Sequence, residues 1–161
     1  MVIACIVRRV SRAEAADVFS LVEEYYDAVS VIARDDRAKL LHYLADSRSG
    51  VWIAYDDANA VGCILYHPLP ELGSAGEVKR LYVRPAFRRR GIAHVLLRSL
   101  EEFAMSQGAS SLYLDTNESL HAAVTFYERN GYVRCSRYND NPQATIFMRK
   151  IILPAPTGRL A

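Results

Sequence analysis

The sequence predicts a fold of the α/β class, in its α+β form, with a mixed central sheet of about six to seven strands and about four helices on its two faces. Three observations lead to this prediction. The chain has 161 residues, of which 51% are hydrophobic, and this is enough for one domain with a buried core. Its first half contains short apolar runs bounded by polar turns. Its second half follows a strand, helix, strand, helix order, which is typical of a crossover unit.

The first half of the chain contains three extended and two helical segments. Residues 2–7 are apolar and β-branched, and they predict a strand. Residues 11–14 have the pattern of a capping box, so a helix is expected to begin there. A second helix, on the surface, is expected over 35–46. The apolar runs 51–55 and 61–66 flank a polar link and predict a hairpin of the longer-loop kind.

The second half contains the crossover. Its first strand joins the hairpin, so three antiparallel strands are expected in that part of the sheet. The stretch beyond the last strand is expected to be a loose tail over 154–161, which leaves one domain over residues 1–153. The expected elements are a strand over 77–83, a helix over 91–107, a strand over 110–115, a helix over 119–129, and strands over 132–135 and 144–152.

The charge balance argues against a large polyanion as the partner. Lys and Arg together number 20, Asp and Glu number 18, and the net charge is +2. A charge this small gives no global field that would attract nucleic acid or an anionic membrane. We therefore expect neither partner. The oligomeric state stays open at this point, with a homodimer among the states considered.

The cysteines and histidines show no metal-binding or disulfide pattern. Cys5, Cys63 and Cys135 are odd in number and far apart, so we expect buried, inert thiols, with one reactive thiol as the alternative. The four histidines have no ligand-type spacing, and no metal site is expected. The apolar run at the N-terminus precedes its basic pair, the wrong order for a signal peptide, and no apolar run approaches ~18 residues. These features predict a cytoplasmic protein.

An arginine-rich turn connects the strand over 77–83 to the following helix. Three arginines at 88–90 precede Gly91, and the start of a helix offers unpaired N–H groups and the positive end of its dipole. A polyphosphate ligand fits this arrangement. The alternatives are a solvated turn and a nucleic-acid patch. Neither the Walker pattern nor the dinucleotide fingerprint is present, so the site would be of another type.

Two motifs in this region resemble a known family. Arg88, Gly91 and Ala93 occupy the three fixed positions of the pattern [Q/R]xxGx[G/A], the acyl-CoA signature of the GNAT N-acyltransferases. The strand at 114–117 and the segment 126–132, Phe-Tyr-Glu-Arg-Asn-Gly-Tyr, are similar to the strand and helix that follow in that family. The resemblance covers about residues 77–135 and implies a GNAT-type fold.

The resemblance also implies acetyl-CoA as the cosubstrate. Backbone N–H groups of the turn 88–93 would bind the pyrophosphate, and the pantetheine arm would pair with the main chain near Leu81 and Val83. The strand 77–83 has no cleanly apolar face, and a bulge that separates it from 110–115 would explain this and admit the arm. The residues expected at the coenzyme are Leu81, Tyr82, Val83, Arg88, Arg89, Arg90, Gly91, Ile92, Ala93, Asn117 and Phe126.

Two side chains are candidates for acid–base chemistry. An amine with a pKa of about 10.4 is mostly protonated at pH 7, and releasing that proton costs about 4.6 kcal/mol, so a base is useful. Glu77 is the candidate, since family members often have a glutamate there; the alternative is a surface carboxylate paired with Lys79 or Arg80. Tyr127 is the candidate acid for the departing thiolate. Its alternative is a core aromatic on the buried stripe of its helix.

The acceptor is expected between the first two helices and the loop 138–142. Tyr25, Tyr26, Tyr138 and Asn141 are the candidate binding residues, and the acidic and phenolic groups near them suit a cationic amine. The function predicted from the resemblance is direct acetyl transfer to a primary amine of a small molecule in a ternary complex. A protein or peptide amine as acceptor, and an acyl-CoA sensor without turnover, are the alternatives; a nucleic-acid binder is the weakest.

Overall fold

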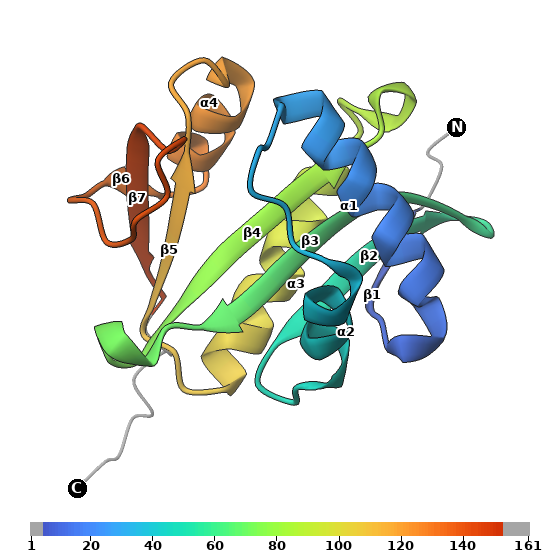
Figure 1. Ribbon diagram of the computed structural model, residues 1–161, viewed down its shortest axis with the longest axis horizontal. Helices are drawn as coiled ribbons and strands as arrows, with labels where there is room; N and C mark the ends of the chain where they lie inside the picture. Colours follow the sequence, from blue (N-terminus) through green and yellow to red (C-terminus); the bar gives the residue numbers. More distant parts are fainter. Residues whose placement is uncertain (1–4, 153–161) are drawn as a thin grey trace, which may run out of the picture.

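A computed structural model describes residues 5–152 of the chain and contains one seven-stranded sheet with the strand order β1-β2-β3-β4-β5-β7-β6 (Figure 1). The predicted tail 154–161 and the first part of the strand predicted at 2–7 lie outside the described residues. The strands are β1 (Ile6–Arg9), β2 (Gly50–Asp56), β3 (Asn59–Pro68), β4 (Ala75–Val83), β5 (Ser111–Thr116), β6 (Val133–Arg134) and β7 (Ile146–Ile151). The helices are α1 (Ala15–Val29), α2 (Arg37–Ala45), α3 (Ile92–Ser106) and α4 (His121–Arg129), with short 3-10 turns at Arg12–Glu14, Pro70–Leu72 and Pro85–Phe87.

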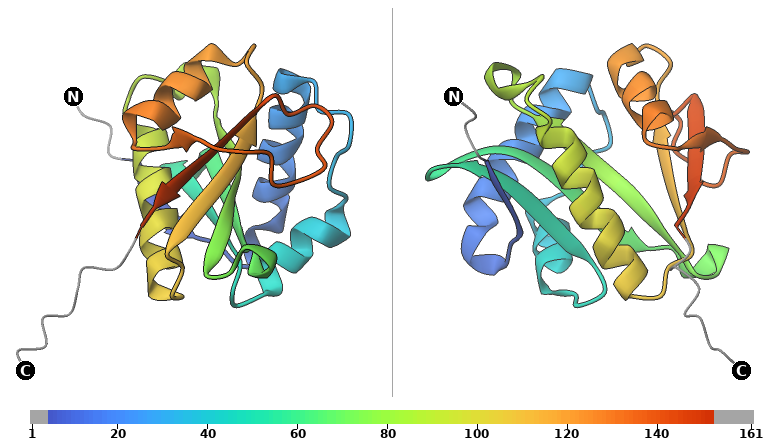
Figure 2. Two further views of the ribbon diagram at one scale, coloured as in Figure 1. Left: turned by 90° about the vertical axis from the view of Figure 1, so that its left-hand side faces the viewer. Right: turned by 180° about the vertical axis from the view of Figure 1, so that it is seen from behind.

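The helices form two layers, one on each face of the sheet. Helices α1 and α2 cover one face, and α3 and α4 cover the other (Figures 1 and 2). Each layer has its own core. Leu96, Leu97 and Leu100 of α3 pack with Val124 of α4 on one side, while the α1 and α2 side chains pack on the other. No helix within residues 5–152 is long and apolar enough to cross a membrane.

The N-terminal part of the sheet differs from the sequence prediction in two details. It has four antiparallel strands rather than three, because β1 pairs antiparallel with β2. The β2–β3 hairpin is also tighter than predicted. Asp56 pairs with Asn59, so only two residues form the turn, and Asp57 has a φ of 51°. An aspartate adopts this left-handed conformation more readily than most residues, which permits the short connection.

Strand β4 contains the bulge that its mixed pattern predicts. Cys63 pairs with Tyr82 and Leu65 pairs with Lys79, so two β4 residues stand opposite one residue of β3. Arg80, one of these two, has a φ of 55°. A bulge of this kind bends a strand and redirects its side chains.

Beyond Glu77, β4 and β5 separate. The two strands pair in parallel only from Ala75–Glu77 to Ser111–Tyr113, although both continue further. Figure 1 shows them diverging from their common start. The β5-facing edge of β4 therefore has no strand partner over its second half, as the sequence analysis expects.

Candidate active site

The connection from β4 to α3 presents free backbone N–H groups to solvent. Arg89 and Gly91 have φ values of 63° and 78°, so two residues of this short turn have a left-handed backbone. The N–H groups of Arg90, Gly91, Ile92 and Ala93 have no acceptor among the described residues. With the positive end of the α3 dipole, they are a candidate anion site.

The arginines of this turn differ in their roles. All three are exposed. Arg88 donates from Nε to the carbonyl of Val83 at 2.8 Å, which fastens the turn to the end of β4. The guanidinium of Arg90 lies over the ring of Phe87. The main chain therefore provides the donors of the site, and the arginines add positive charge around it.

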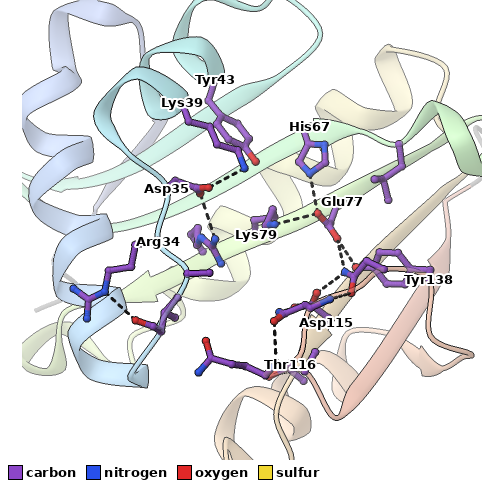
Figure 3. A pocket seen from close by; sticks show the side chains of 18 of the residues that line it. Arg34, Asp35, Lys39, Tyr43, His67, Glu77, Lys79, Asp115, Thr116 and Tyr138 are labelled. Carbon is purple, nitrogen blue, oxygen red and sulfur yellow. Dashed lines mark hydrogen bonds and ion pairs between the residues drawn. The ribbon is translucent and has the colours of Figure 1, made fainter.

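A cavity of about 930 Å³ lies on the α1 and α2 face of the sheet. Its walls are the segment that joins α1 to α2, the adjoining part of α2, the start of β4, and the loop between β6 and β7 (Figure 3). The turn 88–93 does not line this cavity, so the anion site and the cavity are separate features. The gap between β4 and β5 lies between them.

Glu77 is a buried member of the cavity wall, only 4% exposed. Its carboxylate contacts Nε2 of His67 at 2.8 Å and Nζ of Lys79 at 3.4 Å, and it accepts a 2.6 Å hydrogen bond from the hydroxyl of Tyr138. Burial raises the pKa of Glu77, but the hydrogen bond from His67, the charge of Lys79 and the bond from Tyr138 outweigh it and lower the pKa to about 2. Glu77 is therefore ionised at neutral pH. Of the two ion-pair partners predicted for Glu77, Lys79 is present. The other, Arg80, pairs with Asp35 instead.

Asp115 of β5 lies beside Glu77 across the gap. Asn139 donates to Asp115 at 2.6 Å and approaches Glu77 at 3.5 Å, so one amide lies between the two carboxylates. Asp115, His67 and Asn139 were not among the site residues predicted from the sequence. Their positions depend on tertiary contacts between distant segments, which no local pattern of the sequence encodes.

Tyr127 belongs to the core on the α3 and α4 face. Its ring packs edge-on against the rings of Phe126 and Tyr132, with centroids 5.4 Å and 5.5 Å apart. Burial raises the pKa of Tyr127 well above its ordinary value, with smaller contributions from Tyr25 and Asp115. Both of these residues line the cavity on the other face, whereas Tyr127 itself does not.

Of the remaining residues predicted to contact the coenzyme, all but Asn117 pack against the core. Ile92, Tyr82 and Val83 are buried, while Leu81, Ala93 and Phe126 are half-buried against the core. Asn117 lines the cavity instead, where its amide donates to the carbonyl of Gln143 at 2.9 Å and its carbonyl caps the N–H of Ser119.

Three of the four acceptor candidates come together. Tyr25, Tyr138 and Asn141 line the cavity, and Tyr26 does not. The hydroxyl of Tyr26 accepts from the N–H of Asp35 at 3.0 Å and donates to its carboxylate at 3.1 Å. Its role in this structure is to hold Asp35 in place.

A family model, described as the acetyltransferase (GNAT) family, matches residues 15–132. The chain belongs to this family. Among curated proteins, it is 34% identical over 99 residues to an uncharacterized N-acetyltransferase of Schizosaccharomyces pombe, covering 60% of each chain. It is 28% identical over 121 residues to the probable N-acetyltransferase family 8 member 5 of Mus musculus, covering 73% of this chain and 53% of the relative. The match thus spans between half and three fifths of these GNAT relatives.

Solved structures show the same GNAT fold. A GNAT acetyltransferase from Staphylococcus aureus superposes with a TM-score of 0.80 at 19% identity, covering 92% of this chain and 99% of that one. The PaiA N-acetyltransferase of Thermoplasma acidophilum, solved in complex with coenzyme A, has a TM-score of 0.76 at 17% identity, again covering 92% and 99%. The predicted fold class is confirmed.

Proposed function

We propose that this GNAT protein is an N-acetyltransferase of the cytoplasm that moves an acetyl group from acetyl-CoA to the primary amine of a small molecule. The observation that carries the proposal is the separation of β4 and β5 beyond Glu77. It leaves a free strand edge between an anion site on one side and a polar cavity on the other. A two-substrate transfer needs this arrangement, because donor and acceptor must meet at one point.

The donor would lie along β4. Its pantetheine arm would pair with the free main chain near Leu81 and Val83, in the manner of an added strand. Its pyrophosphate would accept hydrogen bonds from the free N–H groups at 90–93. A structural neighbour of 17% identity was solved with coenzyme A, which supports this choice of ligand. The coenzyme supplies the thioester, whose carbonyl would lie at the gap.

The acceptor amine would attack from the cavity. Its nitrogen forms a bond to the thioester carbonyl carbon, the proton on nitrogen passes to a base, and the C–S bond then breaks. The products are an N-acetyl amide and the coenzyme thiol once the thiolate gains a proton. Backbone N–H groups near Leu81 or Val83 are suited to stabilise the oxyanion.

The low pKa of Glu77 limits how it can serve as the base. A carboxylate with a pKa of about 2 stays ionised but holds a proton poorly. We therefore assign Glu77 to orienting a water molecule that takes the proton, and to attracting the cationic amine into the site. Tyr127 has the opposite property. The phenol is protonated at neutral pH, as a proton donor to the thiolate must be, but burial raises its pKa and makes it a weaker acid than an ordinary tyrosine.

A small acceptor is favoured over a peptide by the closure of the cavity on one side. Gln143 accepts from the N–H of Ile32 at 2.9 Å and donates to the carbonyl of Ser30 at 3.2 Å. These bonds join the α1–α2 segment to the β6–β7 loop, and they block an extended chain from passing between them. The volume of about 930 Å³ fits a small-molecule site.

Thiol release tests the proposal. The purified protein is incubated with acetyl-CoA and one amine at a time from a panel of amino acids, polyamines, aminoglycosides and short peptides. We expect free thiol only when a suitable small amine is present. Release with peptides alone would favour a peptide acceptor, and no release with any amine, despite coenzyme binding, would favour a sensor.

A further inference from the structure

The cavity lining carries charges of both signs in equal number. Five Lys and Arg side chains and five Asp and Glu side chains contribute to it. They do not neutralise each other evenly, however. At the α1–α2 end, Lys39 and Arg80 both pair with Asp35, at 2.9 Å and 3.3 Å, and with no other carboxylate of residues 5–152. Two cations share one anion there, so this end keeps an excess of positive charge.

The opposite end has an excess of negative charge. Among the described residues Asp115 forms no ion pair, and its hydrogen bonds come from the neutral amides of Asn139 and Asn141, at 2.6 Å and 3.3 Å. Glu77 is next to it. In Figure 3 the Asp35 and Lys39 group and the Asp115 group lie on opposite sides of the cavity. The cavity is therefore polarised along its length.

Arg80 is poorly satisfied by the protein itself. Its hydrogen bond to Asp35 is long, at 3.3 Å, and its Nε is buried without a partner in the part of the chain that the structure describes. A guanidinium has five N–H donors, and buried donors without acceptors are unfavourable. The bulge places this side chain in the cavity at the cost of a left-handed backbone, with φ 55°, that L residues rarely adopt.

The rings of Tyr25 and Tyr26 lie beside the guanidinium of Arg80, with centroids 5.8 Å and 5.0 Å from its central carbon. They hold it in one orientation. A planar guanidinium held in this way matches a carboxylate in two-point geometry better than a lysine does. An anionic group on the acceptor would give the terminal N–H groups of Arg80 acceptors in addition to Asp35.

We propose that the acceptor carries a carboxylate as well as the primary amine, with the carboxylate bound by Arg80 and Lys39 and the amine directed to Asp115 and Glu77. The acceptor class is therefore a free amino acid or a similar zwitterion. The inference rests on the proposed acetyl transfer and adds Arg80 as the residue that determines specificity. It adds a carboxylate to the cationic amine that the sequence predicts for the acceptor.

Matched acceptors test the class in the unaltered protein. Thiol release is measured for α-amino acids and for longer ω-amino acids. Each amino acid is compared with two analogues: its carboxamide, and the amine that lacks the carboxyl carbon. We expect kcat/KM about tenfold or more higher for the carboxylate member of at least one set. The carboxamide is a strict comparison. Its amine is less basic than that of the amino acid, so a larger fraction is unprotonated and nucleophilic at neutral pH, which by itself would favour the carboxamide. Equal or faster release with the carboxamides would overturn the proposal.

Variants locate the effect. Arg80→Gln should lower kcat/KM for the amino acid about tenfold to hundredfold and leave the decarboxylated amine within about twofold. Arg80→Lys, which keeps the charge, should recover part of the loss. Arg98→Gln, an exposed change on α3, is the matched control and should change neither. If Arg80→Gln and Arg80→Lys lower kcat/KM equally for the amino acid and for the decarboxylated amine, Arg80 does not recognise the carboxylate. Absence of release with every amine would instead overturn the acetyl transfer itself.

Discussion

The hydroxyl of Tyr138 donates a 2.6 Å hydrogen bond to the carboxylate of Glu77, 61 positions earlier in the chain. This bond fastens the β6–β7 loop to β4 at the residue where β4 and β5 begin to separate. It also explains why the proposed donor and acceptor sites meet at a defined point. The loop that borders the cavity and the strand that would bind the donor share one buried carboxylate.

Loss of this bond should affect the acceptor more than the donor. Tyr138→Phe removes the hydroxyl and keeps the ring, which packs against Tyr113 and Phe147. A hydrogen bond to a charged group contributes about 1.5–3 kcal/mol, so we expect KM for the amine to rise about tenfold or more. Affinity for coenzyme A, measured by calorimetry, should stay the same. A matching loss of coenzyme affinity would show that the loop supports both sites.

Glu77 should make stability depend on acid pH. Its folded pKa, about 2, is below its ordinary value of 4.5, so the stabilisation is present above pH 4.5 and is lost as the pH falls toward 2. The contribution is on the order of 3 kcal/mol. Glu77→Gln should lower the free energy of unfolding at pH 7 and flatten its decline between pH 4.5 and 2. Urea unfolding at several pH values measures both. If the free energy of unfolding falls with pH equally in the unaltered protein and in Glu77→Gln, Glu77 does not cause the acid dependence.

Tyr127→Phe should separate catalysis from binding. The phenylalanine keeps the edge-on packing with Phe126 and Tyr132 and removes only the hydroxyl. If this hydroxyl protonates the thiolate, kcat should fall about a hundredfold, with the dissociation constant of coenzyme A unchanged. An equal loss in both quantities would assign Tyr127 a structural role in the core.

Gly91→Ala tests the turn at the start of α3. Gly91 has a φ of 78°, and a Cβ there meets open space, so the substitution strains the backbone without a clash. Gly108, just after the other end of α3, has a φ of 86° and equally open surroundings, and Gly108→Ala is the matched control. Both should lose about 1 kcal/mol of stability. Only Gly91→Ala should weaken coenzyme A binding, and equal affinities in the two variants would remove the turn from the donor site.

The elements of this fold could be predicted because most of them are determined locally. Periodicity predicted α3 within one residue at each end, and the capping box at 11–14 predicted the helical start that the structure forms as a 3-10 turn leading into α1. The mixed faces of β4 predicted a bulge, since a strand with no apolar face does not fit a regular sheet. The four-strand antiparallel region was missed because β1 joins β2 across some forty residues, a pairing that no local pattern encodes.

The site was less predictable for the same reason. Glu77 and Tyr127 were identified through family resemblance, but the low pKa of Glu77 depends on His67 and Tyr138, which arrive from distant segments. Arg80 looked like a surface partner of Glu77. The bulge turns it to Asp35 instead, and this tertiary effect produces the polarised cavity.

Calorimetric titration with coenzyme A tests whether the edge of β4 and the start of α3 bind the donor. We expect one-to-one binding with a dissociation constant below about 1 mM, weakened in Gly91→Ala and unchanged in Gly108→Ala. No heat of binding at millimolar coenzyme A would contradict it, because the free edge of β4 and the N–H groups at the start of α3 would then have no donor to hold.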